Sequence, residues 1–276
     1  MLPGTAHGDD VVAHGGASRM ARRSAVSFAD ALGSFIAMTL DTGRALFRRP
    51  FQWRELLEQI VFIARVSVGP AIMLTVPFLG VVIFLINQLL VQIGAVDLSG
   101  AGVGLGVVRE IGPLAAVLIV AGAGATAICA DLGSRTIREE IDAMKVLGID
   151  PLQRLVVPRV LASTLVAMAL NSLVSIVGIS TGYALSVLVQ GASPGQFMAN
   201  LTLLTGLSDF VLSEIKAAVF GLSAGLVACY RGLTTSGGAK GVGDAVNQTV
   251  VLAIAALFVF NTVLSAVYLQ LGLTAN

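Results

Sequence analysis

The sequence predicts an all-α integral membrane protein with an N-terminal amphipathic helix, five transmembrane helices and a short cytoplasmic helix between spans two and three. Of the 276 residues, 56% are hydrophobic and only 12% are charged, and the mean hydropathy is +0.90. A soluble domain of this length needs far more charge to cover its surface. Several apolar runs also exceed the roughly 18–20 residues that cross about 30 Å of hydrocarbon.

Residues 1–25 are predicted to form a disordered cytoplasmic tail, because they are polar and lack the apolar region of a signal peptide. His7 and His14 have no Cys or acidic partners at ligand spacing, so we expect no metal site there. Cys129 and Cys229 lie towards the ends of apolar runs, and we interpret them as small packing residues rather than a disulfide.

An interfacial amphipathic helix is predicted over residues 26–52. Apolar side chains recur at three- to four-residue spacing, which places them on one face: Phe28, Leu32, Phe35, Ile36, Leu40 and Phe47. Such a helix would lie at the membrane surface, with Trp53 near the headgroups and Pro50 ending the helix. A soluble helix that packs on protein is the alternative.

Residues 53–276 are predicted to form a five-span domain. The apolar runs cover Val66–Val91, Leu105–Ala130, Val156–Val189, Leu204–Tyr230 and Ala245–Leu271. Pro70 and Pro77 should bend the first span. Small residues predict close helix approach in span two (Ala121, Gly122, Gly124 and Ala125) and at the pairs Gly178/Gly182 and Gly221/Gly225.

The basic residues predict the orientation. They precede the first span, fill the segment between spans two and three, and recur between spans four and five, whereas residues 92–104 and 190–215 contain no Lys or Arg. Because cytoplasmic loops carry the excess of Lys and Arg, we expect a cytoplasmic N-terminus and an extracytoplasmic C-terminus.

The charged segment between spans two and three predicts a short helix over about residues 135–150. Asp131 and Ser134 can cap its start, and Gly148 with Pro151 can close it. Three acids load its early turns: Glu139, Glu140 and Asp142. A solvated loop that obeys the charge rule is the alternative.

Charges at the outer ends of two spans predict a second candidate site, because intramembrane charges usually face a cavity or a partner. Arg109 and Glu110 begin span two, and Glu214 and Lys216 stand near the start of span four. A salt bridge that locks the two spans is the alternative. Near Leu74 and Phe78, a bent first span could line a lipid-sized cavity, or it could simply form a kinked wall.

No enzymatic site is predicted. The segment Ser236–Gly241 is rich in glycine, but its Lys240 precedes Gly rather than the Ser or Thr of a phosphate-binding loop. No catalytic triad, paired carboxylates or Cys/His metal cluster can be assembled, and no nucleic-acid partner is expected. The chain therefore needs no cofactor, and any ATP and Mg would be bound by another subunit.

Four blocks in sequence resemble the signature of the MlaE/YrbE permeases: Arg109–Pro113, Leu118–Ala125, Glu139–Met144 and Val157–Ala162. These are membrane subunits of lipid-transporting ABC systems that work with MCE-domain proteins. Two further blocks, Gly225–Gly232 and Gly237–Val246, resemble the A-type YrbE permeases of actinobacterial Mce operons in particular. The resemblance runs from about Phe28 to near the end of the chain.

The resemblance implies that the short helix is a coupling helix, with Glu139, Glu140, Asp142 and Met144 docking in a cytoplasmic ABC ATPase that binds ATP and Mg. It also implies that Arg109, Glu110 and Lys216 lie near a lipid headgroup. A second YrbE-type permease, as a heterodimer, and MCE-domain proteins are the implied partners in the plasma (inner) membrane.

The resemblance further implies import of a lipid such as a fatty acid, a mycolate-type lipid or a sterol. Two alternatives belong to other functional classes. A non-transporting scaffold for an MCE complex would assemble the same partners. A secondary transporter would show repeated halves or midplane charges, and the sequence has neither.

Overall fold

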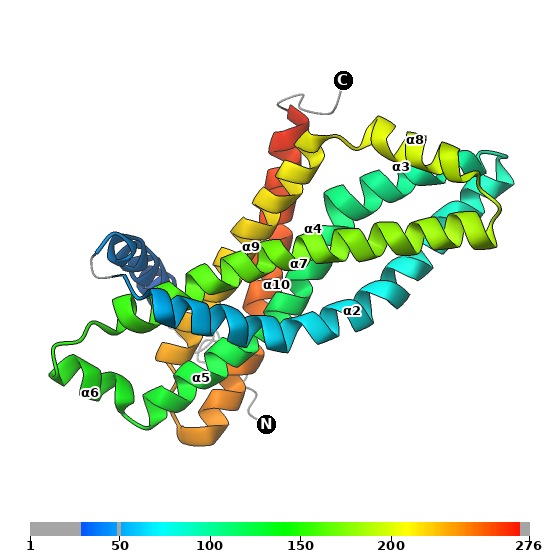
Figure 1. Cartoon of the computed structure of the whole chain (residues 1–276). Coiled ribbons are helices and arrows are strands. Elements are labelled where there is room, and N and C mark those ends of the chain that lie inside the picture. Colours follow the sequence, from blue (N-terminus) through cyan, green and yellow to red (C-terminus); the bar gives the residue numbers. More distant parts are fainter. Residues whose placement is uncertain (1–28, 49–50, 271–276) are drawn as a thin grey trace, which may run out of the picture.

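The computed structural model describes residues 29–48 and 51–270. Regular structure in these residues is helical throughout, with no strand (Figure 1). The all-α prediction is therefore confirmed. The predicted tail over residues 1–25 lies outside the described residues.

Five helical segments are long and apolar enough to cross a membrane, which confirms the predicted number of spans. The first is α2 (Trp53–Gln92), the fourth is α9 (Leu207–Leu233) and the fifth is α10 (Gly238–Gln270). Span two joins η1 (Val96–Leu98), α3 (Ser99–Val103), η2 (Gly104–Ile111), α4 (Gly112–Ile119), η3 (Val120–Ala125) and α5 (Thr126–Ile137). Span three joins η4 (Leu152–Val156), α7 (Val157–Tyr183) and η5 (Ala184–Val189).

The first span begins at Trp53, earlier than the apolar run that starts at Val66. Charged residues interrupt the hydropathy there but not the helix, since Arg54 and Glu58 pair across one turn at 3.0 Å. Both predicted prolines lie inside α2, and Figure 1 shows the helix changing direction along its length. Its 40 residues measure about 60 Å, so α2 must tilt or extend beyond the hydrocarbon.

Close helix contacts form where small residues face a neighbouring helix. A Cβ on Gly221 of α9 would lie 2.5 Å from Ala167 Cβ of α7, and one on Gly178 would lie 2.6 Å from a Leu79 methyl group of α2. These contacts confirm the predicted approach at both glycine pairs. Gly122 differs: it is exposed and has nothing within 4 Å of its Cβ position, so it does not contribute to helix packing in this chain.

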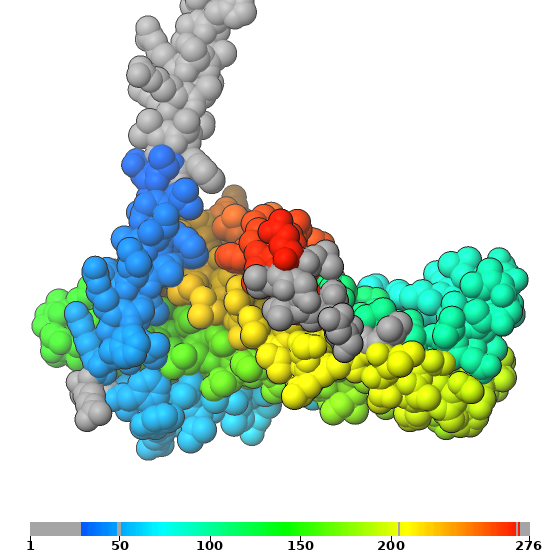
Figure 2. Space-filling model, turned by 90° about the horizontal axis from the view of Figure 1, so that it is seen from above, coloured from blue at the N-terminus to red at the C-terminus, as the bar shows by residue number. Residues whose placement is uncertain are grey.

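The N-terminal helix covers residues 29–46 and packs on α9. The Tyr230 hydroxyl donates a hydrogen bond to the Ala31 carbonyl at 3.0 Å, and the Phe35 and Tyr230 rings meet edge to face. The predicted apolar face is divided, because Phe35 packs on the core while four members are exposed: Leu32, Ile36, Leu40 and Phe47. Figure 2 shows this helix, in blue, projecting from one end of the molecule.

The short helix between spans two and three is α6 (Glu140–Val146). It is shorter than the predicted 135–150, because α5 continues to Ile137. The predicted cap at Asp131 and Ser134 is wrong, since both residues lie inside α5 and the Ser134 hydroxyl donates to the Asp131 carbonyl. Gly148 closes the helix as predicted, in the left-handed region at φ +74°.

A helix that the sequence analysis did not separate, α8 (Pro194–Leu204), lies between spans three and four. It packs against α3 at the end of the molecule far from α6 (Figure 1). The approach is close, because a Cβ on Gly100 would overlap the Phe197 carbonyl. The two helices cover this end of the bundle.

Candidate functional site

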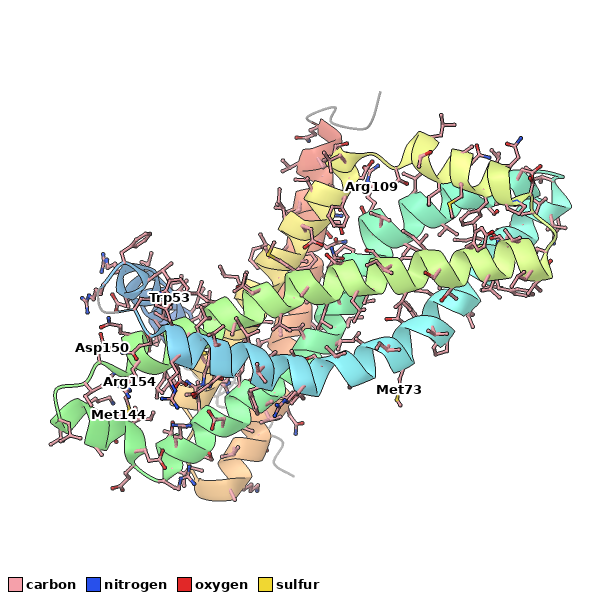
Figure 3. All side chains as sticks on the ribbon, viewed as in Figure 1. Trp53, Met73, Arg109, Met144, Asp150 and Arg154 are labelled. Carbon is pink, nitrogen blue, oxygen red and sulfur yellow. The ribbon has the colours of Figure 1, made fainter. Side chains whose placement is uncertain are left out.

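A cluster of polar side chains lies inside the bundle at the end far from α6, where Figure 3 labels Arg109. We call it the distal cluster. It is drawn from η2, α9 and α10, and its members are Arg109, Glu110, Asp209, Lys216, Ser265 and Tyr268. The three predicted polar lipid-site residues are therefore brought together.

Lys216 is the centre of the distal cluster and is fully buried, with 0% of its side chain exposed. Its Nζ donates to Glu110 Oε1 at 2.9 Å and to the Arg109 carbonyl at 3.3 Å. A buried ammonium is tolerated in an apolar span only with such partners. This geometry matches the salt bridge between spans two and four that the sequence analysis left as the alternative.

Arg109 and Tyr268 connect the ion pair to α10. The Arg109 guanidinium lies 4.7 Å from the centre of the Tyr268 ring, and its Nε is 3.9 Å from Glu110 Oε1. The Tyr268 hydroxyl donates to Asp209 at 3.0 Å, and Asp209 in turn accepts the Gly206 amide at the start of α9. These contacts hold Arg109 at the rim of the cluster.

A second polar group surrounds Glu214, which was predicted among the charges near the start of span four but was not assigned to the lipid site. The Glu214 carboxylate accepts hydrogen bonds from Asn171 at 3.0 Å and from Ser172 at 2.7 Å, both on α7. The Asn171 amide also reaches Ser213 at 2.8 Å. Asn171 and the serines could have been found as polar side chains inside a long apolar run, a pattern that marks interhelical hydrogen bonds.

The exposure of the distal cluster determines what a ligand meets first. The Glu110 side chain is 38% exposed and Arg109 is 17% exposed, whereas Lys216 is shielded behind them. Glu110 sits at the end of η2, a π-helical segment, and π-helical turns are frequent at functional sites. The Glu110 carboxylate therefore combines access to solvent with a direct ion pair to the buried ammonium of Lys216.

Leu74 and Phe78 do not join this cluster. Both are exposed on α2, which packs on α7 and not on the helices α9 and α10 that carry most of the cluster. Figure 3 shows the neighbouring Met73 pointing away from the other helices. The face that carries Leu74 and Phe78 is thus an outer surface of this chain.

The opposite end of the molecule presents α6. Glu139 precedes it with φ +60°, a left-handed conformation that is uncommon for a residue other than glycine. Glu140 pairs with Arg138 at 3.0 Å, and Asp142 pairs with Lys145 at 2.8 Å. Two of the predicted acids, Glu140 and Asp142, therefore lie in this short helix, and Glu139 lies directly before it.

Met144 is half-buried, and it packs against the hydrophobic core rather than facing outward. The exposed apolar residues are instead Val146 and Leu147, with 88% and 74% of their surface accessible. Their position could have been predicted, because the buried Ile141 and Met144 define one face of a helix and leave Val146 on the other. The outward surface of α6 thus combines charge with two apolar side chains.

Among the described residues, no group of three or more His, Cys, Asp or Glu is placed to hold a metal ion. Cys129 and Cys229 are both buried free thiols, in agreement with the packing interpretation.

A family model described as "Permease MlaE" matches residues 56–267 of the chain, which run from the first turn of α2 almost to the end of α10. A probable ABC transporter permease protein of Synechocystis sp. is 33% identical over 218 residues, covering 79% of this chain and 82% of that protein.

Two further relatives extend the comparison. The chloroplastic protein TRIGALACTOSYLDIACYLGLYCEROL 1 of Arabidopsis thaliana is 32% identical over 227 residues, which are 82% of this chain and 64% of that protein. A probable ABC transporter permease protein of Rickettsia conorii is 28% identical over 246 residues, which are 89% of this chain and 95% of that protein. The similarity therefore includes all five candidate spans.

Proposed function

The chain belongs to the MlaE family of permeases, and from this premise we propose that it is the transmembrane subunit of an ATP-driven lipid transport system. In this proposal it couples the motions of a cytoplasmic ATPase to lipid movement between the membrane and MCE-domain proteins. A second permease of the same family completes the membrane core, and the direction is import. The chain performs no covalent chemistry of its own.

The observation that carries the proposal is the surface of α6. A short helix held between two membrane spans, with acids and two exposed apolar side chains on its outward face, suits a groove on a soluble partner. Glu139, Glu140 and Asp142 supply charge, and Val146 and Leu147 supply apolar contact. A merely solvated loop gains nothing from exposing two large apolar residues together.

The distal cluster supports a headgroup site at the other end. An anionic headgroup would first meet Arg109 and then compete with Glu110 for the ammonium of Lys216. Because the lysine is already paired inside the protein, binding exchanges one carboxylate for another anion and avoids burying an unpaired charge. Release follows when Glu110 returns to Lys216.

The gathering of bases at the α6 end supports a cytoplasmic location for α6 and an outward location for the distal cluster. Exposed Leu74 and Phe78 then belong to a surface that the second permease or the bilayer covers, where they can contact acyl chains. The Trp53 indole, exposed at the start of α2, suits the headgroup region on the cytoplasmic side.

The test is to purify the tagged chain from its native membrane in mild detergent and to identify the co-purifying proteins and lipids by mass spectrometry. The variant Glu139→Lys/Glu140→Lys should lose the ATPase while keeping the second permease, the MCE proteins and the lipid. Asp41→Lys, an exposed acid on the N-terminal helix, is the matched control and should keep all of them.

A second arm addresses the lipid. Glu110→Gln removes the competing carboxylate charge but keeps the shape, so the amount of co-purified anionic lipid should change while the ATPase is retained. If no ATPase accompanies the wild-type chain under any gentle condition, the proposal fails and a non-transporting scaffold explains the protein better. If the ATPase is present but Glu110→Gln leaves lipid occupancy unaltered, the headgroup site is elsewhere.

A further inference from the structure

Arg159 is among the largest side chains that the described protein buries completely. It lies in the first turn of α7, just after the charged segment that contains α6. In the sequence it is one of several bases that flank this segment, where solvent exposure would be ordinary. A guanidinium withdrawn completely from solvent needs compensating partners.

Those partners come from three different elements. The Arg159 Nη2 donates to Asp131 Oδ2 of α5 at 2.7 Å, and Nη1 donates to the Leu155 carbonyl of η4 at 3.0 Å. Nη1 also lies 3.6 Å from Glu55 Oε1 in the first turn of α2. We call Arg159 with Asp131 and Glu55 the Arg159 clamp.

Both acids of the clamp are held in place by neighbours on their own helices. Arg135 Nε lies 3.2 Å from Asp131 Oδ1, and the Gln59 amide donates to Glu55 Oε1 at 3.0 Å. Asp131 therefore bridges two arginines, with one oxygen for each. The planar guanidinium of Arg159 can serve several acceptors in fixed directions, which the single ammonium of a lysine cannot do.

The clamp joins the two segments that lie on either side of α6. The chain enters α6 from α5 and leaves it through η4, and Arg159 bonds to both of these arms. Its third contact reaches α2, the first span. The clamp thus ties together the two arms that carry α6 and joins them to the start of α2.

From this geometry we propose that Arg159 is a positioning residue that makes α2, α5 and α7 move as one body when α6 is displaced. The inference rests on the proposed function, because it assigns to the clamp the step between the ATPase and the spans. Without the clamp, a push on α6 is absorbed by independent movement of its two arms and does not reach α2.

The test uses Arg159→Lys, which keeps the positive charge but loses the fork that reaches three acceptors. Spin labels are placed at Lys145→Cys on α6 and Leu57→Cys on α2, two exposed sites, in the full complex in nanodiscs; both native cysteines are buried. Double electron–electron resonance should give one narrow distance distribution in the wild type, with and without ATP. Arg159→Lys should broaden it.

Arg54→Lys is the matched control, because this exposed arginine at the same end of α2 pairs with Glu58 on its own helix. It should keep the narrow distribution. In the same samples, the lipid moved per ATP hydrolysed should fall about tenfold for Arg159→Lys, the scale of an ordinary coupling between sites. Basal ATP hydrolysis should persist, since the ATPase is a separate chain.

The proposal is overturned if Arg159→Lys keeps both the narrow distribution and the wild-type ratio of lipid to ATP. It is also overturned if the variant loses only assembly, with a normal ratio in the complex that remains, because the role is then purely structural. Asp131→Asn, which leaves Arg159 in place, repeats the test if Arg159→Lys does not fold. If the wild type moves no lipid at all, the proposed function fails, and the label distances still test the clamp.

Discussion

The ion pair between Lys216 and Glu110 connects α9 to η2 inside an apolar bundle. Its two members differ in exposure. The buried Lys216 contributes to stability, whereas the more exposed Glu110 can contact a ligand. Lys216 has no access to solvent, so its charge depends on Glu110 and the Arg109 carbonyl. Glu110 reaches the surface and can meet a ligand directly.

We expect Lys216→Met to lower the stability of the protein by about 3 kcal/mol, because Glu110 loses its partner in an apolar surrounding. Thermal unfolding in detergent measures this loss. Lys145→Met removes an exposed lysine from a similar pair and should change stability by about 0.5 kcal/mol or less.

Adding Glu110→Gln to Lys216→Met should restore part of the stability, because the uncompensated carboxylate is then removed together with its partner. If the double variant loses more stability than the two single variants lose when their losses are added, the ion-pair interpretation is contradicted. So would equal losses for Lys216→Met and Lys145→Met.

At Glu139, substitutions can test the effect of the backbone conformation on stability separately from the effect of the carboxylate charge. Its φ of +60° disfavours a side chain, so Glu139→Gly should keep or raise the stability by up to about 1 kcal/mol. Glu139→Val should lower it, because a β-branched residue fits this conformation worst. The thermal unfolding midpoint checks both, and a lower midpoint for Glu139→Gly would contradict the assigned backbone conformation.

At the scale of helices, the pairing of α7 with α9 depends on the absence of side chains. A Cβ on Gly221 would lie 2.5 Å from Ala167 Cβ and 2.9 Å from the Ser163 carbonyl, and the backbone atom cannot rotate aside. The Ser163 hydroxyl also donates to the Gly221 carbonyl at 2.8 Å. At this point the two helices therefore meet through their backbones, next to the hydrogen bond between Ser163 and Gly221.

Gly221→Ala should therefore destabilise the protein by about 1–3 kcal/mol, the usual effect of overpacking a well-packed contact. Gly122→Ala is the same substitution in the middle of span two at an exposed site, and it should be neutral or slightly stabilising. Thermal unfolding of the two variants side by side measures the difference. Equal effects would show that α7 and α9 can move apart at no cost.

The N-terminal helix also acts as an element with two surfaces. One surface packs on Tyr230 of α9, and the other leaves Leu32, Ile36, Leu40 and Phe47 exposed, Phe47 by 86%. Exposed apolar side chains in a row at the end of a membrane domain favour contact with lipid over contact with water. Packing on protein thus describes the Phe35 surface, and contact with lipid stays a prediction for the other surface.

At the scale of the whole molecule, the charge asymmetry predicts which end faces the cytoplasm. A cysteine at Val146 on α6 should react with a membrane-impermeant thiol reagent only from the cytoplasmic side, and one at the exposed Leu188 only from the outside. The buried native cysteines should give little background in intact cells. Labelling of both positions from the same side would refute the five-span topology.

The sequence by itself determined the membrane class, the number of spans, the separate charged helix and the family resemblance. Hydropathy and basic residues report these features over about 20 neighbouring residues, which is the length of one span. The end of α6 at Gly148 and the glycine contacts at Gly178 and Gly221 were predictable for the same reason, since a C-terminal glycine and small-residue spacing are local patterns.

Only the tertiary structure decided which charges pair and which side chains face outward. Lys216 and Glu110 are 106 positions apart, and Arg159 meets Asp131 and Glu55 from two other helices. Such contacts depend on the rotation and depth of each helix against its neighbours, which a periodic pattern within one helix does not specify. For that reason the core-facing position of Met144 on α6, the outward position of Leu74 and Phe78 on α2 and the Arg159 clamp emerged only from the packed helices.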